Sequence, residues 1–545
     1  MERPRRFIGI FVLVAILWGM TTVPRVSANE LSNLAEQAQP EEEPLPRTTT
    51  LVIDTVEYEW WLLRWSDNSI VCQVIVEHEG MPTNNEILQD CGQAVYAEWQ
   101  STTACTFPPD EMGNVPQCPG LYFMFISSGA VQKSIEVELP PPSVEVSLSG
   151  CDPSFPENRC AVIPNLLLTG IEPLPNERII EIHAIVNGIE YICYDSVCEV
   201  PLDVTPITGQ EIQFWAISSF GDSSDQFTAQ VRVIESGVSA SPGYYVDVLS
   251  SQWSGRDIAT CAQTWGAFPP VGGPPLWLTT PEVPELLASD IPYYFLAGRL
   301  IAQGLVDASQ CPGGGLLPNG YADECGLEKA LPAVLEWQNQ FDIRIIEVAR
   351  ETGVPAQLLK NLFAQESQFW PGVFNSEHLG LGHITPKGVE VVLLWNPSFF
   401  QQFCPLVLDE GVCSNGYAQL DPAYQAILRG ALASKARTDC LDCPAGIDLT
   451  SANASIDLFA QTLLANCEQV AQEVFNATKS TPGVVSDYED LWKFTLANYH
   501  AGPGCLSYAL YTSWNRGRIL DWEAVSQNFT PVCQGVVFYV DQIAK

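Results

Sequence analysis

The hydrophobic pattern of this 545-residue chain changes near Pro284 from the spacing of strands to the spacing of helices. Before that point, short runs of apolar residues alternate with polar ones, as over 144–148, which is typical of half-buried strands. After it, the apolar residues over 341–349 fall on one face of an amphipathic helix. The pattern therefore predicts a multidomain protein with all-β modules first and an α-helical domain second.

The two β regions resemble copies of each other, because three sequence elements recur in the same order. The elements are Cys105-Thr-Phe-Pro, Phe123-Met-Phe-Ile-Ser-Ser-Gly and Ser134-Ile-Glu-Val-Glu-Leu, then Cys198-Glu-Val-Pro, Phe214-Trp-Ala-Ile-Ser-Ser-Phe-Gly and Thr228-Ala-Gln-Val-Arg-Val. A repeat of about 90 residues built from short strands predicts tandem immunoglobulin-like sandwiches. Such modules either bind glycan or protein, or serve as a disulfide-stapled stalk, since the fold alone specifies no ligand.

Residues 1–28 have the three parts of an export signal. Arginines come first, an apolar run follows from Phe7 to Met20, and Val26-Ser-Ala28 is a small-residue cleavage site. An uncleaved N-terminal anchor is the alternative, because the apolar run is almost long enough to span a bilayer. The expected order is a signal peptide at 1–28, a disordered acidic and Pro-rich tether at 29–50, a first β-sandwich at 51–139, a second at 143–236, a Gly- and Pro-rich linker at 237–285 and a helical domain at 286–545 with its core at about 341–545.

Eighteen cysteines, an even number, accompany this export signal. Disulfides confined within each domain are the natural interpretation, in a secreted or cell-envelope protein. Cys440 and Cys443 have the spacing of a zinc or redox pair, but no second pair completes a tetrahedral site and no histidine is close in sequence. We therefore expect a structural disulfide at this pair and no metal or other cofactor.

The formal net charge of the chain is −39, and its pI is near 4.2. Nucleic-acid binding requires neutralising Lys and Arg, so this composition excludes nucleic acid as a partner. The chain also carries no basic patch for anionic lipid, and no apolar run beyond the signal approaches membrane length.

A helix expected after Pro355 carries an apolar stripe that leads to Glu366. The stripe consists of Leu358, Leu359, Leu362 and Phe363. Because Glu366 continues the stripe, its carboxyl points toward the apolar side, where burial raises a carboxyl pKa. A raised pKa is what a glycosidase general acid needs at neutral pH. The alternative is a capped or paired structural glutamate near a helix end.

Three strings in the C-terminal part occur in an informative order. They are Phe-Ala-Gln-Glu-Ser-Gln-Phe-Trp at 363–370, Gly-Leu-Gly-His-Ile-Thr-Pro at 380–386 and Leu-Ala-Asn-Tyr-His-Ala-Gly-Pro-Gly at 496–504. Together they resemble the lysozyme-like domain of soluble lytic transglycosylases and goose-type lysozymes, over roughly the last 200 residues. That family usually shows a helix ending in Glu-Ser, then Gly-Leu-Met-Gln-x-x-Pro, then Ala-Tyr-Asn-Ala-Gly-Pro-Gly.

The resemblance implies an enzyme that cleaves the MurNAc–GlcNAc bond of peptidoglycan glycan strands and leaves 1,6-anhydro-muropeptides. It implies Glu366 as the catalytic residue, with Tyr499 close to it. The substrate-binding residues that it implies are Ser367, Gly380, Leu381, His383, Tyr499 and His500. A hydrolytic muramidase and a catalytically silent glycan-binding protein are the alternatives. The closing segment 538–543 also resembles the family, where a Tyr-Val pair recurs, although packing alone explains such a pair.

The chain departs from the family pattern at Gly382, His383 and His500, which replace Met, Gln and Asn. The histidines either substitute for the amides as donors, or tune binding between about pH 5 and 8, or hold a metal together with a carboxylate. A second catalytic carboxylate, which a hydrolase usually needs, also stays open. Its candidates are Glu377, Asp409, Glu410 and Asp421. The strong acidity of the chain is unexpected beside a cell-wall substrate that is often anionic itself.

Overall fold

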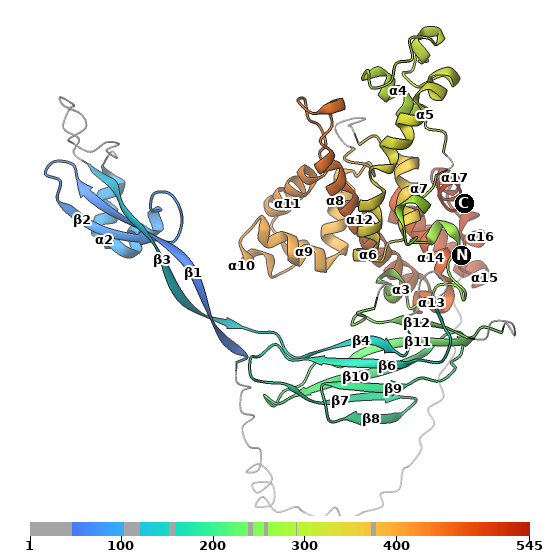
Figure 1. Cartoon of the computed structure of the whole chain (residues 1–545), viewed down its shortest axis with the longest axis horizontal. Coiled ribbons are helices and arrows are strands. Elements are labelled where there is room, and N and C mark those ends of the chain that lie inside the picture. The colour runs from blue at the N-terminus through green and yellow to red at the C-terminus, as the bar shows by residue number, and fades with distance from the viewer. Residues whose placement is uncertain are drawn as a thin grey trace, which may run out of the picture. The chain divides into compact units, whose positions relative to one another are not determined.

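A β-rich region of antiparallel sheets precedes a helical region, as the change of periodicity predicts (Figure 1). The computed structural model describes residues 46–102, 120–151, 158–237, 243–255, 260–289, 291–371 and 378–545. The expected signal peptide and most of the expected tether at 29–50 lie outside these residues. The last three residues of that tether, 48–50, are instead paired with 136–138 in a sheet.

In the first compact unit, which ends at Glu138, the described residues form a single sheet with one helix and not the expected sandwich. Its strands run in the order β2-β1-β3, and a Cys72–Cys91 disulfide ties the helix to β2. The helix begins at Thr83, whose side chain forms a capping box with Glu86. The elements are β1 (Thr48–Arg64), β2 (Ile70–Val76), α2 (Asn84–Ser101) and β3 (Leu121–Glu138).

The expected internal repeat is wrong. In the first unit, the segments beginning at Phe123 and Ser134 belong to one continuous strand, β3. In the second β region, the matching segments form two strands, β10 and β11, which pair with each other antiparallel. The turn sequence Phe220-Gly-Asp-Ser-Ser-Asp lies between those two strands, whereas the residues after Gly129 continue the β3 strand. Similar strand sequences therefore occur in different topologies.

The second β region packs two antiparallel sheets face to face. One sheet has the order β4-β6-β9 and the other β5-β12-β11-β10-β7-β8, and inward-facing residues of both sheets form one core. The elements are β4 (Ser143–Ser149), β5 (Arg159–Cys160), β6 (Asn165–Ile171), β7 (Ile179–Val186), β8 (Ile189–Cys193), β9 (Val197–Pro201), β10 (Gln210–Ser218), β11 (Phe227–Glu235) and β12 (Tyr244–Leu249).

The expected linker at 237–285 is also wrong, because this segment supplies strand β12 and helix α3 (Thr260–Trp265). A disulfide joins Cys261 of α3 to Cys467, and the buried Trp265 ring contacts Trp492 at 5.2 Å. Arg232 of β11 pairs with Asp247 of β12 and donates to the Pro269 carbonyl. The high Gly and Pro content of this segment suggested a linker, but the segment contacts both the two-sheet module and the helical region.

The helical region shares one hydrophobic core that extends to Ile543, with the 30-residue helix α12 at its centre. The helices α6, α8, α14 and α15 all contact α12. The α-helices described after α3 are α4 (Tyr294–Ala302), α5 (Glu324–Asn339), α6 (Asp342–Thr352), α7 (Ala356–Glu366), α8 (Pro386–Trp395), α9 (Pro397–Phe403), α10 (Glu410–Cys413), α11 (Pro422–Lys435), α12 (Leu449–Thr478), α13 (Pro482–Val485), α14 (Tyr488–Ala501), α15 (Pro503–Gly517), α16 (Trp522–Ser526) and α17 (Gly535–Ile543).

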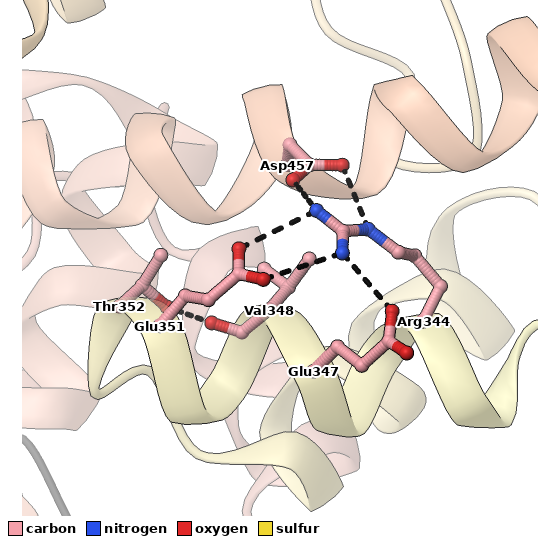
Figure 2. A network of polar contacts seen from close by, with 6 residues as sticks. All are labelled: Arg344, Glu347, Val348, Glu351, Thr352 and Asp457. Carbon is pink, nitrogen blue, oxygen red and sulfur yellow. Dashed lines mark hydrogen bonds and ion pairs between the residues drawn. The ribbon is translucent and has the colours of Figure 1, made fainter.

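A polar network fixes α6 against α12 at the surface (Figure 2). The Arg344 guanidinium of α6 bonds Asp457 of α12 and also the carboxylates of Glu347 and Glu351 on its own helix. The proximity of these carboxylates, with Asp457 first, raises the pKa of Arg344. Because α6 packs against α7, this network also supports the helix that ends at Glu366.

Eight disulfides join the described cysteines, and the expectation of an oxidised protein is confirmed for them. Cys440 and Cys443 form one of these bonds, as expected. One bond, Cys261–Cys467, crosses an expected domain boundary, so the pairs are not all confined as predicted. This number of disulfides is typical of proteins outside the cytosol. In the part of the chain that the structure describes, every helix is too short or too polar to cross a bilayer.

Candidate functional site

Glu366 is the last residue of α7, and its side chain is half-buried. The apolar stripe of α7 is completely buried, as its periodicity predicts. The Tyr539 hydroxyl, from α17, donates a hydrogen bond of 2.5 Å to Glu366 Oε1. Burial raises the pKa of Glu366 to about 7, and the hydrogen bond from Tyr539 opposes part of that rise. A carboxyl whose pKa is raised toward neutrality can hold its proton near pH 7, which suits a proton donor.

The chain leaves α7 through a left-handed turn that fixes the position of Glu366. Gln368 and Phe369 have φ values of 49° and 59°, which cost on the order of 1 kcal/mol each for residues other than glycine. Gln368 Oε1 accepts hydrogen bonds from the backbone N–H groups of Phe295 and Leu296 at the start of α4. The Trp337 indole donates to the Phe369 carbonyl at 2.8 Å. Backbone strain held by such contacts is characteristic of functional sites.

A buried ion pair lies beneath this turn. Lys360 of α7 is completely buried, and its Nζ lies 2.5 Å from a carboxylate oxygen of Asp342 on α6. The same ammonium lies 4.9 Å from the centre of the Phe369 ring. Burial raises the pKa of Asp342 to about 6, although Lys360 opposes that rise. The ion pair therefore joins α7 to α6, and the same lysine contacts Phe369 of the strained turn.

The loop expected to line the site is a tight hairpin closed by backbone bonds between Leu379 and Ile384. A Cβ atom on Gly382 would lie 1.9 Å from the Phe459 ring, so no larger residue fits in this backbone position. The Tyr499 hydroxyl donates to the Gly382 carbonyl at 2.7 Å and pins the loop to α14. The absence of a side chain at Gly382 therefore permits a close approach of the loop to α12.

Two residues of α14, Tyr499 and His500, contact the Gly382 loop and Tyr539. The Phe459 ring makes an edge contact with Tyr499, whose pKa is raised by burial and by the nearby Glu366 carboxylate. His500 is exposed to solvent on one side and stacks on Tyr539 with 3.8 Å between ring centres. Glu366, Tyr539 and His500 therefore form a continuous row in which each member contacts the next.

His383 behaves differently from the titrating group that the sequence suggested. It stacks on His378 with 5.4 Å between ring centres. Burial and the nearby His378 lower the pKa of His383 to about 4. This lowered pKa favours the neutral form of His383 between pH 5 and 8 and argues against pH tuning by this residue. Among the described residues, no group of three or more His, Cys, Asp or Glu side chains is placed to hold a metal ion.

The other predicted site residues serve mainly as support in this structure. Ser367 is 2% exposed and its hydroxyl donates to the Phe363 carbonyl. Gly380 and Leu381 are buried, and the Leu381 N–H donates to Ser455 Oγ. Direct contact of these three with a substrate stays a prediction. The side chains of His383, Tyr499 and His500 are at least partly accessible to solvent, whereas those of Ser367 and Leu381 are buried.

Two of the four candidates for a second carboxylate, Asp409 and Asp421, are described in enough detail to place. Asp409 and Asp421 are exposed, and Asp421 caps α11 by accepting from the Ala423 N–H. Glu377 and the side chain of Glu410 lie outside what the structure describes, so both stay predictions. The sequence interpretation missed Tyr539 as a site residue, although the Tyr-Val pair of the closing segment pointed to it.

No protein-family model, curated protein or solved structure matches this chain in the comparisons with known proteins. The geometry around Glu366 and the motif resemblance are therefore the grounds for a functional proposal.

Proposed function

We propose that this protein is an exported lytic transglycosylase that cleaves the MurNAc–GlcNAc bond of peptidoglycan. In this proposal the helical region is a lysozyme-like domain, and the two-sheet module before it is an immunoglobulin-like sandwich. The observation that carries the proposal is the Glu366 carboxyl, whose pKa lies near 7 and whose hydrogen-bond partner is a tyrosine. One carboxyl of raised pKa at a helix end is sufficient for a reaction in which the substrate supplies its own nucleophile.

The chemistry follows from the two oxygens of that carboxyl. Tyr539 donates to Oε1, so the acidic proton resides on Oε2 and is available to the glycosidic oxygen. As the bond to the muramoyl carbon breaks, an oxocarbenium-like centre forms, and the leaving sugar departs as an alcohol. The C6 hydroxyl of the same muramoyl residue then attacks that centre. Glu366, now a carboxylate, takes the hydroxyl proton and is restored as an acid.

Product analysis tests the proposal and separates it from the hydrolytic alternative. We expect purified protein to release muropeptides that end in 1,6-anhydro sugars from isolated peptidoglycan, as measured by mass spectrometry. Reducing ends would instead indicate a muramidase that activates water. Binding to peptidoglycan without either product would indicate a silent glycan-binding protein.

The pH profile provides a second test, because Glu366 must be protonated at the start of the reaction. The rate should be highest below about pH 7 and should fall about tenfold for each pH unit above it. Tyr539→Phe removes a bond that lowers the pKa of Glu366, so the alkaline limb should move to higher pH while the maximal rate falls. Tyr511→Phe, at an exposed tyrosine of α15, is the matched control. An alkaline limb unmoved in Tyr539→Phe would contradict the assignment of this limb to Glu366.

A further inference from the structure

Arg299 of α4 is a partly buried cation held between aromatic rings. Its guanidinium carbon lies 5.5 Å from the centre of the Trp370 ring and 5.7 Å from that of the Phe295 ring. Its Nε is buried and has no hydrogen-bond acceptor. Trp370 is itself fixed by stacking on Trp337 at 5.2 Å. The rings hold the plane of the guanidinium, while its N–H groups find no acceptor among the described residues.

An arginine without a carboxylate partner is unusual in so acidic a chain. Asp and Glu number 64 against 25 Lys and Arg, and the buried Arg232 and the partly buried Arg344 and Arg429 each have a carboxylate partner. A buried donor without an acceptor costs free energy that folding does not recover. Arg299 therefore has the properties of a group whose acceptor arrives with a ligand.

The fold places this cation on the turn that follows the proposed acid. Trp370 comes four residues after Glu366, and Gln368 between them binds the first N–H groups of α4. Arg299 lies about one helical turn further along α4 from those N–H groups. The turn that follows Glu366 therefore contacts α4 through Gln368 and the Arg299 guanidinium through Trp370.

We propose that Arg299 is a specificity residue that binds a carboxylate carried by the substrate strand. A guanidinium fixed by stacking presents a planar edge of donors that matches a carboxylate through two parallel bonds. In peptidoglycan the carboxylate belongs either to the lactyl group or to the attached peptide. This inference rests on the proposed function. In a chain of net charge −39, Arg299 would provide a local positive charge that binds an anionic polymer.

The test measures affinity and not turnover. In a Glu366→Gln background, calorimetry compares three probes: peptide-free glycan strands with free lactyl carboxylates, the same strands with these groups converted to amides, and peptide-bearing strands. Arg299→Met should weaken binding of a carboxylate-bearing probe about 10- to 100-fold and leave the amidated strands unchanged. Loss on the peptide-free strands assigns the lactyl group, and loss only on the peptide-bearing strands assigns the peptide. Arg299→Lys should lose an intermediate amount, because it keeps the charge without the planar fork.

Arg518→Met is the matched control, since this arginine also stacks on a tryptophan, Trp514, at 4.9 Å. It should leave all three affinities unchanged. If Arg299→Met and Arg299→Lys weaken all probes equally, or none, the inference about Arg299 is wrong while the proposed function stands. If the parent protein binds no probe, the proposed function fails and the Arg299 inference fails with it.

Discussion

Glu366→Gln is expected to reduce turnover of peptidoglycan by about a thousandfold. Glutamine keeps the shape of the side chain and can still accept the Tyr539 hydrogen bond, but it cannot deliver a proton. Because a single carboxyl serves as acid and then as base in the proposed reaction, no other described group replaces it. Release of anhydro-muropeptides over time, measured by mass spectrometry, gives the rate.

Folding should survive this change, and the sign of the effect on stability is informative. The pKa of Glu366 is raised to about 7 in the folded protein from an ordinary value of 4.5, so the charged form destabilises the fold above pH 7. Glu366→Gln should therefore melt at pH 8 at a temperature equal to or above that of the parent. Glu328→Gln, at an exposed position of α5, is the control that should change neither rate nor melting. Full activity of Glu366→Gln would overturn the assignment.

Lys360→Met is expected to lower the free energy of unfolding of the helical region by about 3–5 kcal/mol. The substitution leaves the Asp342 carboxyl buried without its cation, and a buried unpaired charge is among the costliest defects in a protein. The strained turn after Glu366 also loses the ammonium beneath the Phe369 ring. Denaturant unfolding followed by tryptophan fluorescence gives the free energy.

A second substitution separates the charge effect from lost packing. Lys360→Met with Asp342→Leu should recover most of the stability, because no charge then remains in the apolar contact. Lys493→Met removes a lysine that pairs with Glu489 on the surface of α14, and it should cost under about 1 kcal/mol. Equal losses in Lys360→Met and Lys493→Met would show that the buried pair contributes little.

Local patterns predicted the helical half of the molecule well. The apolar stripe of α7 and the inward direction of Glu366 both follow from helical spacing, which acts within a few residues. Tyr539 was harder to assign, because its contact with Glu366 spans 173 residues of sequence and no local signal records such a contact. The low pKa of His383 likewise results from tertiary burial, which sequence spacing does not report.

The β half was less predictable, since pairing between strands decides its topology. Alternating residues indicate strands, but they do not distinguish the long β3 of the first unit from the β10–β11 hairpin. The helix α2 carries a capping signal at Thr83 and Glu86 that distinguishes this unit from a sandwich. The Gly- and Pro-rich composition of 237–285 predicted a linker, although this segment contains the six-residue strand β12.

The attachment of the sandwich to the helices has a consequence for orientation. The segment 260–269 is linked on both sides, because Cys261 is bonded to Cys467 of α12 and the Pro269 carbonyl accepts from Arg232 of β11, and the two-sheet module and the helical region form one compact unit. A surface that captured the sandwich would therefore also set the direction from which Glu366 meets a glycan strand. Reduction of that disulfide would remove one of the two links without changing a residue of the site.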